Sequence, residues 1–397
     1  MLLTNLPEAI LIQCMPFVGR GNFLFVAGVC RLFRQTYNSF LEQQDHPTPK
    51  TTTMNEIVSS LPRLQLVIDE RSIDVQNAFD YDRTLIRWRG KSEQFLTVAI
   101  KYATLNGNLD VLVWIKKGIA EKWTQYPLSS IDTCNNAAKG GQLKVLQWLR
   151  SEAGGKLYWD AKTCRTAAEN GHLDVLKWAH QNGCKWDETT CLFAASNGHL
   201  EVLKWARQNG CKWNAATCSC AAAGGYFEVL QWARQNSCPW DEQTCSNAAA
   251  YGHFEVLKWL HQSGCPWNKD VCCHAAMNNQ LEMLQWAHHN GCPWDAETCT
   301  KAAKYGHLEI LKWARQNSCP WDEQTCSNAA ASGHFEVLKW LHQSGCPWDE
   351  STCSWLVEGG NFEMLKWARH RGCPWYKYTQ TIFEMQRNYG SPFDEEE

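Results

Sequence analysis

The sequence predicts an all-α solenoid of stacked antiparallel helix pairs, with a small helical segment at its N-terminal side. The first observation is a tryptophan, within a variant of Val-Leu-Lys-Trp-Ala, that recurs every 27 residues from Trp178 to Trp367. The second is that each copy contains two short helical patterns separated by a glycine. A fixed period of this size is typical of stacked repeats, in which each unit buries its apolar surface only against its neighbours.

The first helix of each copy is predicted from its start, its middle and its end. In one representative copy, Asp241 is a good N-cap, because its carboxylate can accept a hydrogen bond from a backbone amide of the first turn. The small residues Cys245, Ala248 and Ala249 follow at helical spacing and let a neighbouring helix approach closely. Gly252 then suits the left-handed residue that ends a helix. The other copies keep Asp or Asn at the N-cap position: Asp160, Asp187, Asn214, Asn268, Asp295, Asp322 and Asp349.

The second helix is predicted by a broad apolar stripe, which in the same copy consists of Phe254, Val256, Leu257, Trp259 and Leu260. A helix of about ten residues is unstable alone, so the array must be stabilised by stacking. Equal spacing on an amphipathic helix favours a core position for the tryptophans over a carbohydrate or cofactor platform. Replacing Trp259 or Trp286 by alanine is therefore expected to cost about 3 to 5 kcal/mol.

The predicted organisation has four parts. Residues 1–45 form a helical segment, residues 46–94 a linker with a degenerate capping repeat, residues 95–378 the repeat array, and residues 379–397 a C-terminal cap with an acidic tail. The earliest tryptophan steps in the array are 34 and 30 residues long, and the additional residues are expected in loops between units.

Composition excludes some classes of partner. The formal net charge is -3, from 38 Lys and Arg against 41 Asp and Glu, so no strongly basic field is available to gather phosphates and nucleic acid is not expected as a partner. No basic and apolar leader and no run of about 18 apolar residues is present, so no membrane partner is expected. The expected state is a monomer in the cytoplasm or the nucleus.

The 21 cysteines are expected to be reduced and buried rather than metal ligands. In the regular copies their spacing alternates between 7 and 20 residues, whereas metal sites favour ligands two to four residues apart. Cys245 and Cys265 represent the two repeated positions, and both are predicted to act as small buried hydrophobic residues. No metal and no cofactor is therefore expected.

The string TCxxAAxxGHxEVLKWLxxxGCPW resembles the ankyrin repeat in its alanine pair, its Gly-His turn and its second helix, over about residues 95–375. The opening is Thr-Cys instead of Thr-Pro-Leu-His, and the unit has 27 residues instead of the usual 33 or so, which removes the projecting hairpin. The resemblance implies an ankyrin-like solenoid that binds other proteins through its first helices and concave face.

Residues 1–45 resemble an F-box, which opens with Leu-Pro and ends with a Val-Cys-Arg-aromatic-Arg cluster. The matching residues are Leu6, Pro7, Ile10, Val29, Cys30, Arg31, Phe33 and Arg34. The resemblance implies that Leu6, Pro7, Ile10, Val29 and Phe33 bind a Skp-type adaptor of a cullin ubiquitin ligase, while the array holds a substrate. The alternatives are a helical cap for the solenoid and an ankyrin scaffold without a ligase link.

An enzyme is the disfavoured class. The chain has no glycine-rich phosphate loop, no nucleophile elbow and no HExxH motif. Five histidines follow a helix-ending glycine, and a residue repeated in equivalent turns is expected to bond local backbone rather than to perform acid–base chemistry. They are His172, His199, His253, His307 and His334.

Partner contacts are expected where the copies differ, because positions without a shared packing role are free to vary. These positions lie in and just after the first helix, and aromatic residues there are expected to be exposed and to contact a partner. Neutral drift at surface positions is the alternative explanation of the variety. The candidates are Phe193, Tyr251, His274, Lys301, Tyr305 and Trp355.

Overall fold

A computed structural model describes residues 100–118, 131–151, 157–377, 379–381 and 384. Every regular element in this part of the chain is a helix, as predicted. The F-box-like residues 1–45, the segment 46–94 and the acidic residues 394–397 lie outside it. The odd-numbered helices from α9 to α25 are the first helices of their pairs, and the even-numbered ones from α8 to α26 are the second helices.

The helices fall into two compact units, which are described separately. Unit 1 comprises residues up to 194 and residues 201–212, and unit 2 comprises residues 195–200 and 213–397. The helices of unit 1 are α8 (Leu109–Gly118), α9 (Ile131–Lys139), α10 (Leu143–Arg150), α11 (Ala161–Glu169), α12 (Leu173–Gln181), most of α13 (Glu188–Ser196) and most of α14 (Leu200–Gln208).

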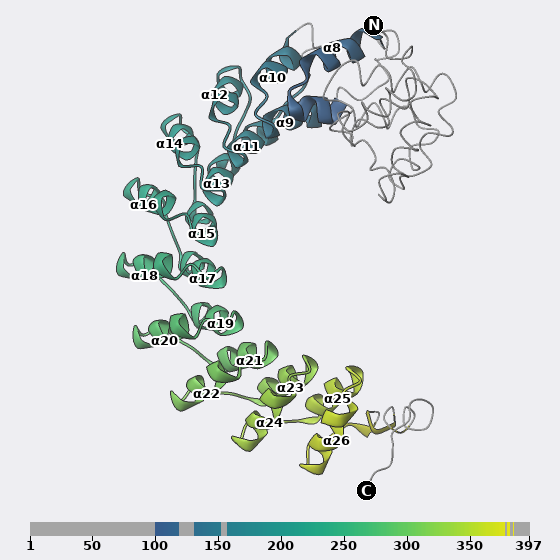
Figure 1. Ribbon diagram of the computed structural model, residues 1–397. Helices are drawn as coiled ribbons and strands as arrows, with labels where there is room; N and C mark the ends of the chain where they lie inside the picture. The colour runs from purple at the N-terminus through teal and green to yellow at the C-terminus, as the bar shows by residue number, and fades with distance from the viewer. Residues whose placement is uncertain (1–99, 119–130, 152–156, 378, 382–383, 385–397) are drawn as a thin grey trace, which may run out of the picture. The chain divides into compact units, whose positions relative to one another are not determined.

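Unit 2 continues the pattern with six helix pairs. Its first helices pack against one another in sequence order, and each also packs against its own second helix. Figure 1 shows the two resulting rows. The helices are α15 (Ala215–Ala223), α16 (Phe227–Gln235), α17 (Glu242–Ala250), α18 (Phe254–Gln262), α19 (Asp270–Met277), α20 (Leu281–His289), α21 (Ala296–Lys304), α22 (Leu308–Gln316), α23 (Glu323–Ala331), α24 (Phe335–Gln343), α25 (Glu350–Glu358) and α26 (Phe362–His370).

Most first helices begin as the N-cap residues predict, but α19 begins one residue late, with Lys269 instead of Asn268 as its N-cap. The Asp295 carboxylate accepts a hydrogen bond from the Glu297 amide at 3.1 Å, and Asp322 accepts one from the Gln324 amide at 3.1 Å. Asp322 also forms a capping box with Thr325, whose hydroxyl oxygen accepts a hydrogen bond from the Asp322 amide at 3.4 Å. These bonds satisfy amides that the first turn leaves without a helical partner.

Four of the five Gly-His turns are hydrogen-bonded to the preceding pair. The Nε2 atom of His253 lies 3.0 Å from the carbonyl oxygen of Ala223, which belongs to the preceding pair. A Cβ added to Gly225 would lie 2.5 Å from the His253 ring, so glycine leaves the space that this ring uses. The expectation of local bonding is therefore wrong for four of the five histidines, because stacking brings a carbonyl of the earlier pair within reach. The same bond recurs at His172, His307 and His334.

The core is aliphatic. Val256, Leu257 and Leu260 of α18 are buried, as are Cys245 and the alanine pair of α17, and the two helices pack against each other. Trp259 is only half-buried, and so are its counterparts from Trp148 to Trp367, which corrects the core position predicted for the tryptophans. The small residues of the first helix let the two backbones approach closely, and a narrow layer has no room for an indole ring.

The cysteines in the described residues are free thiols, and all except the half-buried Cys220 are buried. Cys245 and Cys265 confirm the expectation of small buried residues. The Cys265 thiol donates to the carbonyl oxygen of Asp241 at 3.6 Å, so this position also ties the end of one pair to its own start.

Candidate partner-binding face of the first helices

Three of the predicted contact residues are large aromatic side chains exposed in unit 2. Tyr251 is 67% exposed and Tyr305 is 46% exposed, and they are the C-cap residues of α17 and α21. Trp355 is 46% exposed and lies within α25. Exposed aromatics therefore occur on α17, α21 and α25: Tyr251 and Tyr305 share the C-cap position, whereas Trp355 lies before the C-cap of α25.

The other three predicted residues are half-buried. The Phe193 ring lies under the Arg165 guanidinium, 5.2 Å from its centroid, so the expectation that this aromatic is exposed is wrong. The cause is a neighbouring arginine that covers it. Lys301 forms an ion pair with Glu297 at 3.5 Å. The buried Nδ1 atom of His274 has no hydrogen-bond partner among the described residues. Phe193 belongs to unit 1, and the remaining five residues belong to unit 2.

Charge is unevenly distributed along these first helices. Acidic residues occupy the first turns, with Glu242 in α17, Asp270 in α19, Glu297 in α21 and Glu323 in α23. A carboxylate there is stabilised by the positive end of the helix dipole. The last turns from α17 to α23 contain no acidic residue, and α21 has Lys301 and Lys304 there. From α17 to α23 the face is thus acidic along one edge and neutral to basic along the other, whereas α25 has Glu358 in its last turn.

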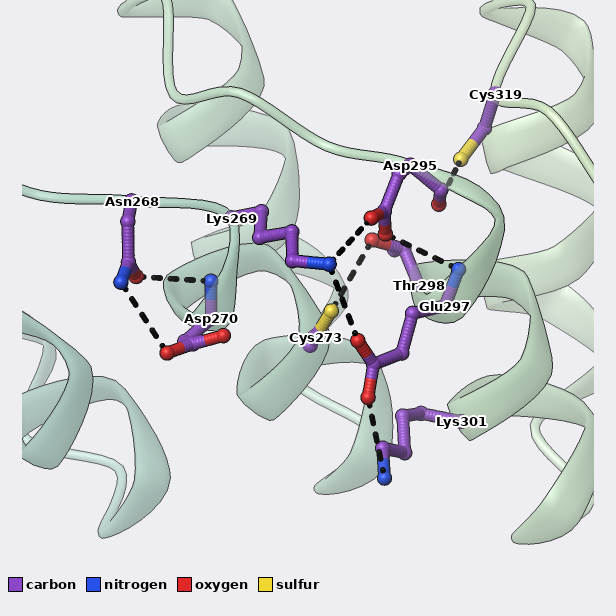
Figure 2. Close-up of polar contacts among 9 residues, drawn as sticks. All are labelled: Asn268, Lys269, Asp270, Cys273, Asp295, Glu297, Thr298, Lys301 and Cys319. Carbon is purple, nitrogen blue, oxygen red and sulfur yellow. Dashed lines mark hydrogen bonds and ion pairs between the residues drawn. The ribbon is translucent and has the colours of Figure 1, made fainter.

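A polar cluster connects α19 to α21 on the acidic edge (Figure 2). The Lys269 ammonium lies 2.6 Å from Asp295 and 3.4 Å from Glu297. The hydrogen bond to Asp295 is the main cause of a raised pKa at Lys269, which keeps this lysine charged. The same Glu297 pairs with Lys301, so two lysines and two carboxylates neutralise one another.

Cys273 lies beside this cluster and was not predicted as a site residue. Its thiol is 3.6 Å from the Thr298 hydroxyl, and burial raises its pKa to about 11. Donor atoms of Cys273, Asp295 and Glu297 lie within 4.8 Å of one another, a spacing compatible with a metal ion. However, the thiol is protonated at neutral pH, and the Lys269 ammonium already supplies a positive charge to both carboxylates. The arrangement therefore fits an ion-pair network better than a metal centre.

The unusual sequence of this copy is the signal that could have revealed the cluster. Lys269 stands where α17 and α23 have Glu242 and Glu323, and Cys273 stands where they have serine. A positive charge at a position that is otherwise acidic indicates a contact with the acidic start of the next helix.

A cleft of about 540 Å³ lies between α21 and α23. Carboxylates border its acidic end, and Lys301 and Lys304 border the other end. The lining residues are Asp295, Ala296, Glu297, Thr300, Lys301, Lys304, Asp322, Gln324 and Asn328.

The tryptophans of the second helices and of the loops pack against one another instead of forming an open platform. The Trp267 and Trp286 rings meet edge to face, with centroids 5.7 Å apart, and the His261 ring stacks on Trp267 at 4.0 Å. In the next copy but one, the Arg315 guanidinium covers Trp321 at 4.2 Å. Histidine or arginine thus covers one face of each of these loop rings, and these contacts stabilise the stack.

Comparison with known proteins agrees with the repeat pattern. The family described as ankyrin repeats (many copies) matches residues 164–207 and 299–342. A search of curated proteins finds no match. No described helix has the length and apolarity needed to cross a membrane.

Two solved structures are similar at low identity. The human ASB11 ankyrin repeat domain is 15% identical with a TM-score of 0.35, and the match covers 40% of this chain and 84% of that one. The pentatricopeptide repeat protein PPR10, solved in complex with an 18-nt psaJ RNA element, is 12% identical with a TM-score of 0.42, and the match covers 84% of this chain and 62% of that one. These scores bear on neither partner nor activity. Residues 164–207 and 299–342 thus match the ankyrin-repeat family, and both segments lie within the array of helices that the structure describes.

Proposed function

We propose that this protein binds another protein along the exposed face of its first helices and holds it for a ubiquitin ligase. The observation that supports binding is the alternating row of exposed aromatics, Tyr251, Tyr305 and Trp355. These side chains are 46% to 67% exposed, and large exposed aromatic residues are enriched among the hot spots of protein interfaces.

The spacing of the row indicates an elongated partner. Neighbouring helices pack about 8 to 10 Å apart, so aromatics on alternate first helices lie about 16 to 20 Å apart along the row. An extended segment covers that distance with about five or six residues. No reaction is proposed, because the polar cluster on this face is an ion-pair network without a nucleophile that is ionised at neutral pH.

The ligase link comes from the F-box resemblance of residues 1–45, in which Leu6, Pro7 and Phe33 match the pattern. In this proposal a Skp-type adaptor binds those residues and the array presents its partner for modification, so the ligase supplies the chemistry. The second candidate is a scaffold that binds through the same row without an adaptor.

Affinity capture from a eukaryotic lysate tests both parts with the full chain. One variant carries Tyr251→Ala, Tyr305→Ala and Trp355→Ala, and a matched control carries Tyr158→Ala, which removes an aromatic that is 66% exposed outside the row. Another variant carries Leu6→Asp and Ile10→Asp. The triple variant should lose array partners that the control retains, and the Leu6 variant should lose only adaptor and cullin.

The outcomes separate the two candidates. Adaptor and cullin recovered with the full chain, and lost only from the Leu6 variant, would support the ligase role. Recovery of array partners without adaptor or cullin in any sample would support the scaffold without a ligase link. Equal recovery with the triple variant and with the control would contradict binding through the row.

A further inference from the structure

Buried thiols occur in pairs within the helix pairs. One cysteine lies in the first helix and the other follows the second helix, 20 residues later, as at Cys191 and Cys211. Both side chains are buried, and the two thiols share a hydrogen bond. The same thiol-to-thiol bond joins Cys164 with Cys184, Cys218 with Cys238, Cys245 with Cys265, Cys272 with Cys292, Cys299 with Cys319, Cys326 with Cys346 and Cys353 with Cys373.

Backbone carbonyl groups hold the sulfur atoms of these pairs in place. The Cys211 thiol donates to the carbonyl oxygen of Asp187 at 3.2 Å. In another helix pair, the Cys353 thiol donates to the carbonyl oxygen of Cys373 at 3.9 Å, and the Cys373 thiol donates to that of Asp349 at 3.6 Å. Because hydrogen-bonded thiols have their sulfur atoms in contact, small side-chain rotations bring these atoms to the disulfide bond length of about 2 Å.

Two of the thiol pairs have an arginine bonded beside them. The Arg207 guanidinium donates to the carbonyl oxygen of Cys211 at 2.8 Å. The Arg369 guanidinium donates in the same way to the carbonyl oxygen of Cys373. The hydrogen bond from the partner thiol, and further the arginine charge, lower the pKa of Cys211 and of Cys353, although burial opposes them. These two pairs therefore form a thiolate, the reactive form of cysteine, more readily.

Helix pairs with histidine in place of this arginine provide the comparison. His261 occupies the position equivalent to Arg207, and its ring stacks on Trp267 at 4.0 Å. In its helix pair, the hydrogen bond with Cys245 and then burial raise the pKa of Cys265, which keeps the thiols protonated. Thiol pairs of the same spacing within one chain thus differ in how readily they ionise.

We propose that Cys191 and Cys211 are a site of reversible oxidation, at which hydrogen peroxide joins the two thiols in a disulfide. Cys353 with Cys373 is the second such site. The Cys211 thiolate bonds to one peroxide oxygen, the O–O bond breaks, and the leaving hydroxide takes up the proton that Cys211 released. The Cys191 sulfur then displaces the hydroxyl group of the sulfenic acid, and a second water leaves with the Cys191 proton. Two electrons pass from the sulfur atoms to the peroxide.

The burial of the site selects a small oxidant. Hydrogen peroxide is little larger than water, so a small local opening of the helix pair admits it, whereas an alkylating reagent needs a larger one. The disulfide would close a covalent ring that contains α14 and the end of α13. This inference stands without the proposed function, because it requires no other protein.

Peptide mapping of the purified, fully reduced full chain tests the site. After treatment with hydrogen peroxide, N-ethylmaleimide blocks the free thiols in denaturant, and tryptic peptides are identified by mass spectrometry. The expected product links residues 186–204 to residues 208–212, and dithiothreitol should separate them. It should form about tenfold faster than the link between residues 235–258 and 259–269, which contain Cys245 and Cys265, because one pKa unit changes the thiolate fraction about tenfold.

Three variants make the test specific. Arg207→Gln removes the charge and should slow the link between Cys191 and Cys211 about tenfold, while the other helix pairs keep their rates. His261→Arg adds a guanidinium and should speed the link in its own helix pair. Cys191→Ser leaves the oxidised Cys211 without a second thiol, so dimedone should trap a sulfenic acid there. Helical circular dichroism verifies that each variant is folded.

Each outcome decides the matter. Preferred linkage of residues 186–204 to residues 208–212, slowed by Arg207→Gln and independent of protein concentration, would support the proposal. Equal rates in all helix pairs, or a rate that Arg207→Gln leaves unchanged, would overturn it, because burial alone would then set the oxidation. Links between different helix pairs, sulfinic acid without a disulfide, or no linkage at all would overturn it as well.

Discussion

Replacing Leu257 by alanine should destabilise the array more than replacing the much larger Trp259. Leu257 on α18 is fully buried, whereas Trp259 on the same helix is half-buried. The change at Leu257 removes three carbon groups at about 0.8 kcal/mol each and leaves a sealed cavity, for a total of about 4 kcal/mol.

The corresponding figure for Trp259 is smaller. A half-buried indole removes about 75 to 125 Å² of apolar surface from water, or about 2 to 3 kcal/mol. The space left by the ring opens to solvent, so no cavity term is added. Its edge-to-face contacts with Trp240 at 6.0 Å and Phe227 at 5.4 Å are included only as buried area.

Urea unfolding followed by helical circular dichroism measures both changes, because this signal does not depend on the removed indole. Leu338→Ala is an internal replicate, since Leu338 is fully buried in α24, whose sequence repeats that of α18. A loss for Trp259→Ala equal to or above that for Leu257→Ala would refute the reasoning and return the tryptophan to the core.

Three further predictions concern titration, thiols and caps. Burial, followed by the neighbouring charge of His289 or Arg371, lowers the pKa of His288 and His342 below 6.5. The unfolded chain therefore takes up protons first, and the free energy of unfolding should fall as pH drops below about 6.5, measured by urea titration at several pH values. Replacing both histidines by arginine, the residue that another copy has at the equivalent position Arg315, should weaken the dependence of the unfolding free energy on pH. An unchanged dependence would contradict the assignment. Among the described cysteines, Cys220 should react first with iodoacetamide in the folded chain, as mapped by mass spectrometry, and early labelling of Cys245 would argue against the buried position. Asp322→Ala should cost about 1 to 2 kcal/mol in thermal unfolding, because the change removes a capping box, whereas no measurable shift would mean that the cap contributes little.

Much of the local structure was predictable from single residues. The Asp and Asn caps, the glycine turns and the apolar stripe each act within one turn of helix, so their effect depends on neighbours in sequence. Exposure of Tyr251, Tyr305 and Trp355 was also predictable, because these positions vary among copies that otherwise share one packing pattern. Phe193 failed the same prediction because Arg165 of the preceding copy covers it.

The sequence by itself determined the helix pairs, their 27-residue period and the all-helical class, since periodic apolar spacing and caps are local signals. Only the tertiary structure decided which residues meet between pairs. His253 reaches a carbonyl 30 residues earlier, Lys269 reaches Asp295 26 residues later, and Trp259 lies at the edge of the layer. Each of these contacts depends on the distance and rotation between stacked pairs. The sequence of a single pair does not determine that geometry.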